Sequence, residues 1–138
     1  MHGLFDVNAV LDVLFEREPW FDDARALWQA HEEGRIVLYL AASSLTDIFY
    51  ISRRLANRER AWDAVETCLN TFEFCSVDVR TLRAAVAGPR QDFEDNVLAA
   101  CAAIAGLNMI ITRDMSGFVG APVLVCTPAE ALTRLVAS

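Results

Sequence analysis

Short apolar runs alternate along the chain with segments in which apolar residues recur every three or four positions. The runs are typical of buried strands and the spaced pattern of amphipathic helices. The predicted strands cover residues 4–7, 36–40, 74–77, 108–112 and 123–125, and the predicted helices cover residues 9 to about 18, 21–33, 44–55, 58–72, 80–87, 92–105 and a last segment from 127. Helices between strands imply right-handed crossovers and a parallel sheet. We therefore expect an α/β fold, with a central parallel sheet flanked by helices in three layers.

The helical stripes also predict which side chains form the core. In the segment 58–72, an inward-facing stripe is expected from Trp62, Val65, Leu69 and Phe72. Trp20 and Trp28 are likewise expected to pack in the core, because all three tryptophans lie at helical spacing.

Length and composition indicate one globular domain over residues 1–138. Although 54% of the residues are hydrophobic, no apolar stretch approaches the roughly 20 residues of a membrane span. The first residues lack the basic segment and long apolar core of a secretion signal, so a cytoplasmic location is expected. The four cysteines lie in apolar surroundings without Cys-x-x-Cys spacing, which favours buried free thiols over disulfides or a zinc site.

The formal net charge of −7 argues against a broad, non-specific nucleic-acid binder, since neutralising phosphates requires clustered cations. It does not exclude a substrate that is held through metal ions, with a few arginines on the flanking backbone. The arginines considered for that role are Arg53, Arg54, Arg90 and Arg113. An acidic surface also suits a basic protein partner.

Four aspartates stand where apolar runs end or where helices begin, namely Asp6, Asp47, Asp95 and Asp114. Ligands of parallel sheets gather beyond the carboxyl ends of the strands, so we expect these side chains to converge there. Carboxylates a few ångströms apart raise one another's pKa unless a cation lies between them. Because oxygen ligands favour Mg²⁺ or Mn²⁺, the pattern predicts a divalent metal site.

Each aspartate also has a purely structural interpretation. Asp6 is suited to cap the next helix, and Asp114 precedes a Ser-Gly pair typical of turns. Ser44-x-x-Asp47 fits a capping box. Asp92 is suited to cap the helix that contains Asp95. In this interpretation the charge of Asp95 stabilises the dipole at the N-terminus of the helix. A purely structural role for all four together is much less probable than for any one of them.

The segments around these aspartates follow a specific order and spacing. They are Phe5-Asp6-Val7-Asn8, residues 44–50 (SLTDIFY), residues 92–100 (DFEDNVLAA), residues 111–118 (ITRDMSGF) and Pro122-Val123-Leu124. Together they resemble the PIN-domain ribonucleases, and in particular the VapC-like toxins of type II toxin–antitoxin systems. Two departures are visible, because Asp47 stands where this family more often has glutamate and Val7 where it often has threonine. Neither departure removes a carboxylate.

The resemblance implies a divalent-metal-dependent endoribonuclease that uses Mg²⁺ or Mn²⁺ and cleaves RNA by metal-activated water. Asp6 and Asp95 are expected as principal ligands, and Asp114 as a further ligand often acting through water. Asp47 is expected as a ligand or a water-orienting base. The supporting residues are Asn8, Asp92 and Thr112, of which Asn8 and Thr112 are candidates for hydrogen bonds beside the carboxylates.

Protein partners follow from the same resemblance. A toxin must be restrained, so we expect a VapB-like antitoxin whose basic tail residue replaces the cations at Asp6 and Asp95. We also expect a homodimer. Some of the aromatic residues on amphipathic segments in the first half of the chain are expected to line a groove for the antitoxin helix or a homodimer face. The candidates are Trp20, Phe21, Trp28, Phe49, Tyr50 and Trp62.

Other classes of protein also place aspartates at strand ends around Mg²⁺. Receiver domains and haloacid-dehalogenase-like phosphatases do so, but they normally use a lysine near the phosphoryl group, and this chain has no lysine. A catalytically silent PIN scaffold that only binds a partner would share the same fold. Metal binding distinguishes that scaffold from a nuclease.

Overall fold

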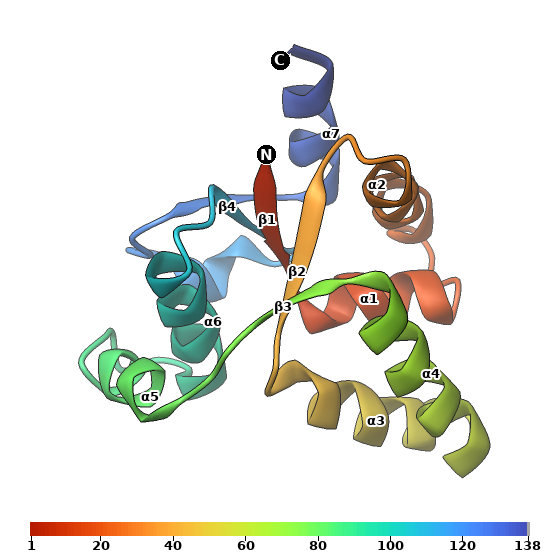
Figure 1. The fold of residues 1–138 in the computed structure, drawn as a ribbon, viewed down its shortest axis with the longest axis horizontal. Helices are drawn as coiled ribbons and strands as arrows, with labels where there is room; N and C mark the ends of the chain where they lie inside the picture. Colours follow the sequence, from red (N-terminus) through yellow and green to blue (C-terminus); the bar gives the residue numbers. More distant parts are fainter. Residues whose placement is uncertain (138) are drawn as a thin grey trace.

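The centre of the molecule is a five-stranded parallel sheet. The computed structural model describes residues 1–137. Its strands are β1 (His2–Phe5), β2 (Val37–Ala41), β3 (Glu73–Cys75), β4 (Met109–Ile111) and β5 (Leu124–Cys126). Their order in the sheet is β3-β2-β1-β4-β5, and all four neighbouring pairs are parallel (Figure 1). The parallel α/β sheet expected from the sequence is therefore confirmed.

Helices cover both faces of the sheet (Figure 1). One apolar core includes residues of α1 (Val7–Leu14), α2 (Phe21–Glu32), α3 (Ser44–Leu55), α4 (Arg58–Thr71) and α7 (Pro128–Ala137). The other core includes residues of α6 (Phe93–Ile104), against which α5 (Val79–Val86) packs. Successive strand residues enter opposite cores, as Leu4 and Phe5 do, because side chains alternate along a strand. Two buried cores on one sheet make the three layers.

Most predicted elements are present, with ends that differ by a few residues. Val7 is a correction, because it begins α1 instead of extending the first strand; Asp6 caps the helix there and ends the extended backbone. A short 3-10 helix, η1 (Met115–Phe118), follows β4 and was not predicted. The four cysteines are buried free thiols, as expected.

Two tryptophans do not lie in the core. Trp62 is 58% exposed and Trp20 is 40% exposed, whereas Trp28 is buried as expected. In α4 the inward face is formed by small residues, namely Ala61, Ala64 and Cys68, and Leu69 is exposed. Trp62 instead packs edge-on against Phe49 of α3, with ring centroids 5.4 Å apart. The small-residue stripe of α4 therefore faces the core, and the bulky Trp62 packs on α3 at the surface.

The strand order determines where a site is to be sought. The chain passes from β1 to β2 and β3 on one side, and later to β4 and β5 on the other. A crevice forms at such a reversal, beyond the carboxyl ends of the two central strands, here β1 and β4. Asp6 directly follows β1, and Asp114 lies three residues after β4. Within residues 1–137, no helix has the length and apolar character needed to cross a membrane.

Candidate functional site

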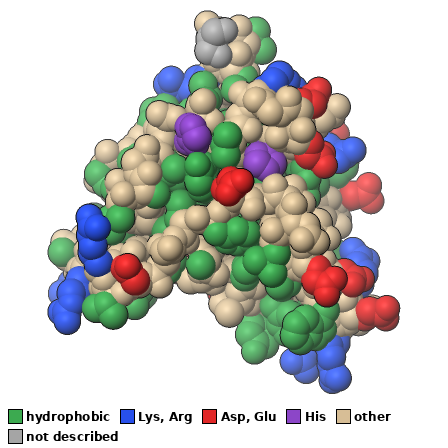
Figure 2. Space-filling model, in the orientation of Figure 1, with side chains coloured by type: hydrophobic (Ala, Val, Ile, Leu, Met, Phe, Trp, Pro, Cys, Tyr) green, Lys and Arg blue, Asp and Glu red, His purple; other side chains and the backbone are tan. Residues whose placement is uncertain are grey.

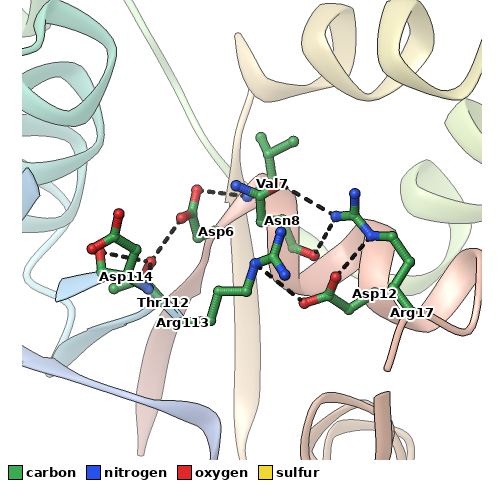
Figure 3. Close-up of polar contacts among 8 residues, drawn as sticks. All are labelled: Asp6, Val7, Asn8, Asp12, Arg17, Thr112, Arg113 and Asp114. Carbon is green, nitrogen blue, oxygen red and sulfur yellow. Dashed lines mark hydrogen bonds and ion pairs between the residues drawn. The ribbon is translucent and has the colours of Figure 1, made fainter. Parts of the chain in front are cut away.

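Asp6 lies at the carboxyl end of β1 with only 9% of its surface exposed. Its backbone N–H donates to the carbonyl of Ile111 (3.0 Å), which continues the pairing of β1 with β4. The Val7 N–H donates to one carboxylate oxygen of Asp6 (2.7 Å), and the Thr112 hydroxyl donates to the other (2.8 Å; Figure 3). Asp6 is thus the helix cap that the structural interpretation foresaw, and it also stands in the crevice between the two central strands.

Thr112 joins Asp6 to Asp114. Its hydroxyl oxygen accepts the Asp114 N–H (3.2 Å) while its hydroxyl hydrogen is directed to Asp6 (Figure 3). The exposed Asp114 carboxylate accepts the N–H and the hydroxyl of Ser116 (3.1 and 2.6 Å), and these bonds lower its pKa. Asp114 is therefore ionised at neutral pH, and it caps η1 as the turn interpretation predicted.

Asp95 lies in the first turn of α6, where Asp92 is the cap and accepts the Asp95 N–H (2.9 Å). Its carboxylate lies directly against the backbone of Gly117 in η1. A Cβ placed on Gly117 would overlap Asp95 Oδ2 and would lie 3.0 Å from its Cγ. Only glycine leaves room for this carboxylate, so η1 and α6 together determine where Asp95 lies.

Like charges dominate the surroundings of Asp95. Partial burial, the charge of Asp92 and the charges of Asp6 and Asp114 raise the pKa of Asp95 to about 6. Burial likewise raises the pKa of Asp6, although the hydrogen bonds from Thr112 and Val7 and the charge of Arg113 oppose that rise. Asp6, Asp95 and Asp114 are therefore close enough to interact electrostatically, as their positions at strand and helix ends suggested.

Glu94 is an additional acid that the sequence reasoning did not single out. Partial burial and the charges of Asp6, Asp95 and Asp47 raise its pKa to about 8, although the residue as a whole remains exposed. One carboxylate oxygen from each of Asp92, Glu94 and Asp95 lies within 4.8 Å of the others. Three acids within four residues at a helix start were the available signal, but successive helix positions do not share a face.

Asp47 approaches, from a different helix, the acid cluster formed by Asp6, Glu94, Asp95 and Asp114. It is in the first turn of α3 and exposed, its pKa is raised by partial burial, and its charge acts on Glu94. The predicted capping box is wrong. Within the described chain, Ser44 is buried with no hydrogen-bond partner for its hydroxyl, and the cap position Ser43 makes no side-chain bond to the helix. Asp47 thus has no capping role that would account for it.

Two of the three expected supporting residues, Thr112 and Asn8, differ in their partners. Thr112 bonds directly to Asp6, whereas the Asn8 carboxamide oxygen accepts from Arg17 (3.2 Å). Arg17 in turn pairs with the buried Asp12 (2.8 Å), and Arg113 approaches the same carboxylate (3.6 Å; Figure 3). The Arg113 guanidinium also lies over the Trp20 ring, 3.6 Å from the centroid. Asn8 is therefore part of an ion-pair network beside the acid cluster.

The donor set fits a hard divalent cation. All the groups that converge are carboxylates, assisted by one hydroxyl, and oxygen ligands are those that Mg²⁺ and Mn²⁺ prefer. Among residues 1–137, the ion pairs to arginine involve Asp12 and Glu33 and none of the clustered acids. The pKa values of three clustered acids, Asp6, Glu94 and Asp95, are thus raised, and none of these acids is paired with a side-chain cation. The absence of a side chain at Gly117 leaves space for the Asp95 carboxylate.

Solved structures share this fold. VapC20 of Mycobacterium tuberculosis, a sarcin–ricin-loop-cleaving toxin, aligns with a TM-score of 0.72 at 13% identity over 88% of this chain and 96% of that one. The FitAcB structure from Neisseria gonorrhoeae aligns with a TM-score of 0.70 at 20% identity over 93% and 99%. A toxin–antitoxin complex from Klebsiella pneumoniae aligns with a TM-score of 0.67 at 22% identity over 91% and 97%.

At these identities the structural matches establish the fold alone. No protein with a curated description matches the sequence significantly. The sequence itself provides the assignment, since residues 3–116 match the PIN domain family, and they contain all four aspartates singled out above. The chain belongs to the PIN domain family.

Proposed function

We propose that this protein is a divalent-metal-dependent endoribonuclease, the VapC-like toxin of a type II toxin–antitoxin pair. The observation that carries the proposal is the gathering of Asp6, Asp95 and Asp114 beyond the carboxyl ends of β1 and β4, without a paired arginine among the described residues. The toxins among the similar structures support it, one of which cleaves the sarcin–ricin loop. A catalytically silent PIN domain that only binds a partner does not need a cluster of carboxylates that repel one another.

Each acid has a distinct role in the proposed site. Asp6 and Asp95 hold the metal; Asp6 is oriented by Thr112 and Val7, and Asp95 by its contact with Gly117. Asp114 is ionised and adds a further oxygen, and Asp47 or Glu94 accepts the proton of the attacking water. A bound divalent cation supplies a lowered water pKa and stabilises charge on the phosphate oxygens. No protein nucleophile is required.

Product chemistry tests this mechanism. Purified protein incubated with RNA and Mg²⁺ or Mn²⁺ should leave 5′-phosphate and 3′-hydroxyl ends, because water attacks the phosphorus. Excess EDTA should abolish cleavage, and added Mn²⁺ should restore it. A 2′,3′-cyclic phosphate product, or cleavage that survives EDTA, contradicts the mechanism. If Mg²⁺ binds but no RNA is cleaved, the binding-scaffold alternative is favoured.

We further propose that the protein is a dimer restrained by a basic antitoxin. Similar structures include toxin–antitoxin complexes, such as VapBC-1 from nontypeable Haemophilus influenzae. Phe49, Tyr50 and Trp62 form an aromatic cluster on α3 and α4, with Tyr50 and Trp62 more than half exposed, and Figure 2 shows hydrophobic side chains over α3. Trp28 is buried, so it is not available to line the groove or dimer face expected from the sequence. An antitoxin helix would pack on this aromatic cluster and direct a basic residue to the acids.

Co-purification with the product of the neighbouring gene tests the partner. The complex should form and suppress cleavage, and suppression should weaken as the metal concentration rises. Trp62→Ala should weaken the complex by at least about tenfold, since buried aromatic anchors dominate interfaces. A strictly monomeric protein with no affinity for that product contradicts both parts of the proposal.

A further inference from the structure

Two cavities lie on either side of the loop between α5 and α6. The larger has a volume of about 280 Å³ and the smaller of about 250 Å³. Both are lined by Gly88, Pro89 and Gln91 of this loop and by Asn96 of α6. Each cavity also reaches one of the acids clustered at the start of α6, since Asp95 lines the larger one and Asp92 the smaller one.

The larger cavity extends from the acid cluster along α6. Asp95 and Gly117 line its start, and Ala99, Ala103 and Ile104 line its far part along α6. The opposite wall is the segment 117–122 that follows β4. Its volume lies just below the range of sites for drug-sized molecules, so it suits a single ring system. Any group bound there lies directly beside whatever the Asp95 carboxylate holds.

The loop that divides the cavities is held firmly in place. The Asn96 amide donates one hydrogen to the carbonyl of Ala85 (3.0 Å) and the other to the carbonyl of Pro89 (2.7 Å). A Cβ on Gly88 would lie 3.0 Å from this amide nitrogen, so the backbone approaches Asn96 closely. Because both amide hydrogens are used, the Asn96 side-chain oxygen is left as an acceptor on a residue that lines both cavities.

The smaller cavity brings together a cation and an aromatic ring. Arg90 and Phe93 line it, and Phe93 is 54% exposed at the first position of α6. Arg80 and Arg83 lie on the adjacent helix α5, and Figure 2 shows arginine side chains at this edge of the molecule. Sites for single-stranded nucleic acids combine cations for phosphates with aromatic rings on which bases stack. Asp92 lines the same cavity, so Arg90 is balanced there by one carboxylate, and the additional positive charge comes from Arg80 and Arg83 of α5.

From this arrangement we infer that the loop between α5 and α6 binds the single-stranded RNA next to the scissile phosphate. One base enters the cavity beside Asp95, the Arg90 guanidinium contacts a neighbouring phosphate, and the Phe93 ring stacks on the next base. The inference rests on the proposed function, since the acids position the scissile phosphate. The cavity joins the acid cluster at Asp95, so the strand passes from one to the other without a gap.

Steady-state cleavage of a single-stranded oligonucleotide with Mg²⁺ tests the subsite. Phe93→Ala should raise KM at least about fivefold with little change in kcat, because stacking on an aromatic ring is lost. Phe93→Trp should retain the wild-type KM and Phe93→Leu should not. Arg90→Ala should reduce the slope of log KM against log salt by about 0.7, the value for one phosphate of a single strand. Arg134→Ala, on the exposed surface of α7, is the matched control and should change neither quantity.

A cavity-filling pair tests the base pocket separately. Ala103→Leu fills the far part of the larger cavity and should change the base preferred beside the cut, whereas Ala105→Leu, at the exposed end of α6, should not. Cleavage with unchanged KM, salt slope and base preference in all these variants refutes the subsite and leaves the nuclease function standing. Wild-type protein that binds Mg²⁺ and cleaves no RNA refutes both. Variants that alter only dimerisation or antitoxin binding show that this surface binds protein, and they too refute the subsite.

Discussion

Asp6 and Asp12 are two buried carboxylates of the same helix, Asp6 as its N-cap and Asp12 near its C-terminal end, and their direct partners differ in kind (Figure 3). Asp12 is 1% exposed and lies between two arginines, with Arg17 at 2.8 Å and Arg113 at 3.6 Å. Asp6 is 9% exposed and receives hydrogen bonds from Thr112 and Val7, and the charge of Asp114 raises its pKa. Burial raises the pKa of both carboxyl groups, but among residues 1–137 Asp12 forms ion pairs with arginine and Asp6 does not, although the charge of Arg113 also lowers the pKa of Asp6.

This difference separates a structural carboxylate from a functional one. The cost of burying Asp12 is offset by Arg17 and Arg113. These ion pairs can therefore hold α1 against the segment after β4 whether or not a metal ion is present. The charge of Arg113 offsets only part of the cost of burying Asp6 beside Asp95 and Asp114, because Arg113 forms an ion pair with Asp12 and not with Asp6. A cation from outside would offset the rest.

The largest effect is expected from Asp6→Asn, which removes a proposed metal ligand but keeps the side-chain shape. RNA cleavage should fall by more than about 100-fold, since even residues that only orient metal ligands typically cost 10- to 100-fold. Thermal stability without metal should stay the same or rise, because carboxylate repulsion is relieved. A large fall in the metal-free Tm, with cleavage retained, would show that Asp6 serves only as the cap of α1.

Asp12→Asn should give the opposite result, a loss of stability. Removing one partner leaves Arg113 and Arg17 without their counter-charge, and breaking a buried pair costs roughly 3–5 kcal/mol. Urea unfolding measures the loss. Adding Arg113→Met to Asp12→Asn should recover part of it, because the uncompensated guanidinium is then removed as well. Equal losses in the single and double variants would mean that the pair is not the cause.

Gly117→Ala should weaken metal binding while preserving the fold. The new methyl group displaces the Asp95 carboxylate, and a displaced ligand should lower Mn²⁺ affinity by about tenfold in calorimetric titration. Gly88→Ala is the matched control, because its methyl group meets Asn96 and none of the acids. Equal Mn²⁺ affinity for the Gly117→Ala variant and the wild-type protein would show that Asp95 is not held by this contact.

The smallest effect concerns pH. The folded-state pKa values of Asp6, Asp95 (about 6) and Glu94 (about 8) lie above the ordinary values near 4, so the folded protein binds more protons than the unfolded chain between these limits. Without metal, stability should therefore be greatest near pH 4–5 and fall as pH rises through 6 and 8. Melting curves from pH 5 to 9 measure it, and Glu94→Gln should flatten the decline. A metal-free Tm that rises over this range contradicts the assignment.

Metal affinity should change in the opposite direction over the same range. A cation binds the ionised carboxylates, so affinity should increase from pH 5 to 8 and binding should release protons. Calorimetry in two buffers of different ionisation enthalpy counts the released protons. Affinity independent of pH would mean that Asp95 and Glu94 are not part of the site.

Local signals in the sequence were sufficient for the elements and for most of the acids. Local spacing left the roles of Asp92 and Asp95 open, and the resemblance to the PIN family favoured Asp92 as the cap; that cap is what the structure contains. Glu94 was missed because successive helix positions point in different directions, and its pKa depends on Asp6 and Asp47 from other elements. Trp62 was placed inward because it lies on the bulkiest apolar stripe of its helix. In the structure the small residues of α4 face inward, and Trp62 packs on Phe49 of α3.

Neighbouring residues specify which strands and helices follow one another along the chain, and they place aspartates at the ends of these elements. Those features depend on periodicity and on caps, which are local properties. Which carboxylates pair with an arginine depends instead on contacts between distant segments. Arg113 reaches Asp12, and Gly117 admits Asp95, because segments far apart in the chain pack together. Burial and charge pairing depend on those distant neighbours, so no local pattern distinguishes Asp6 from Asp12.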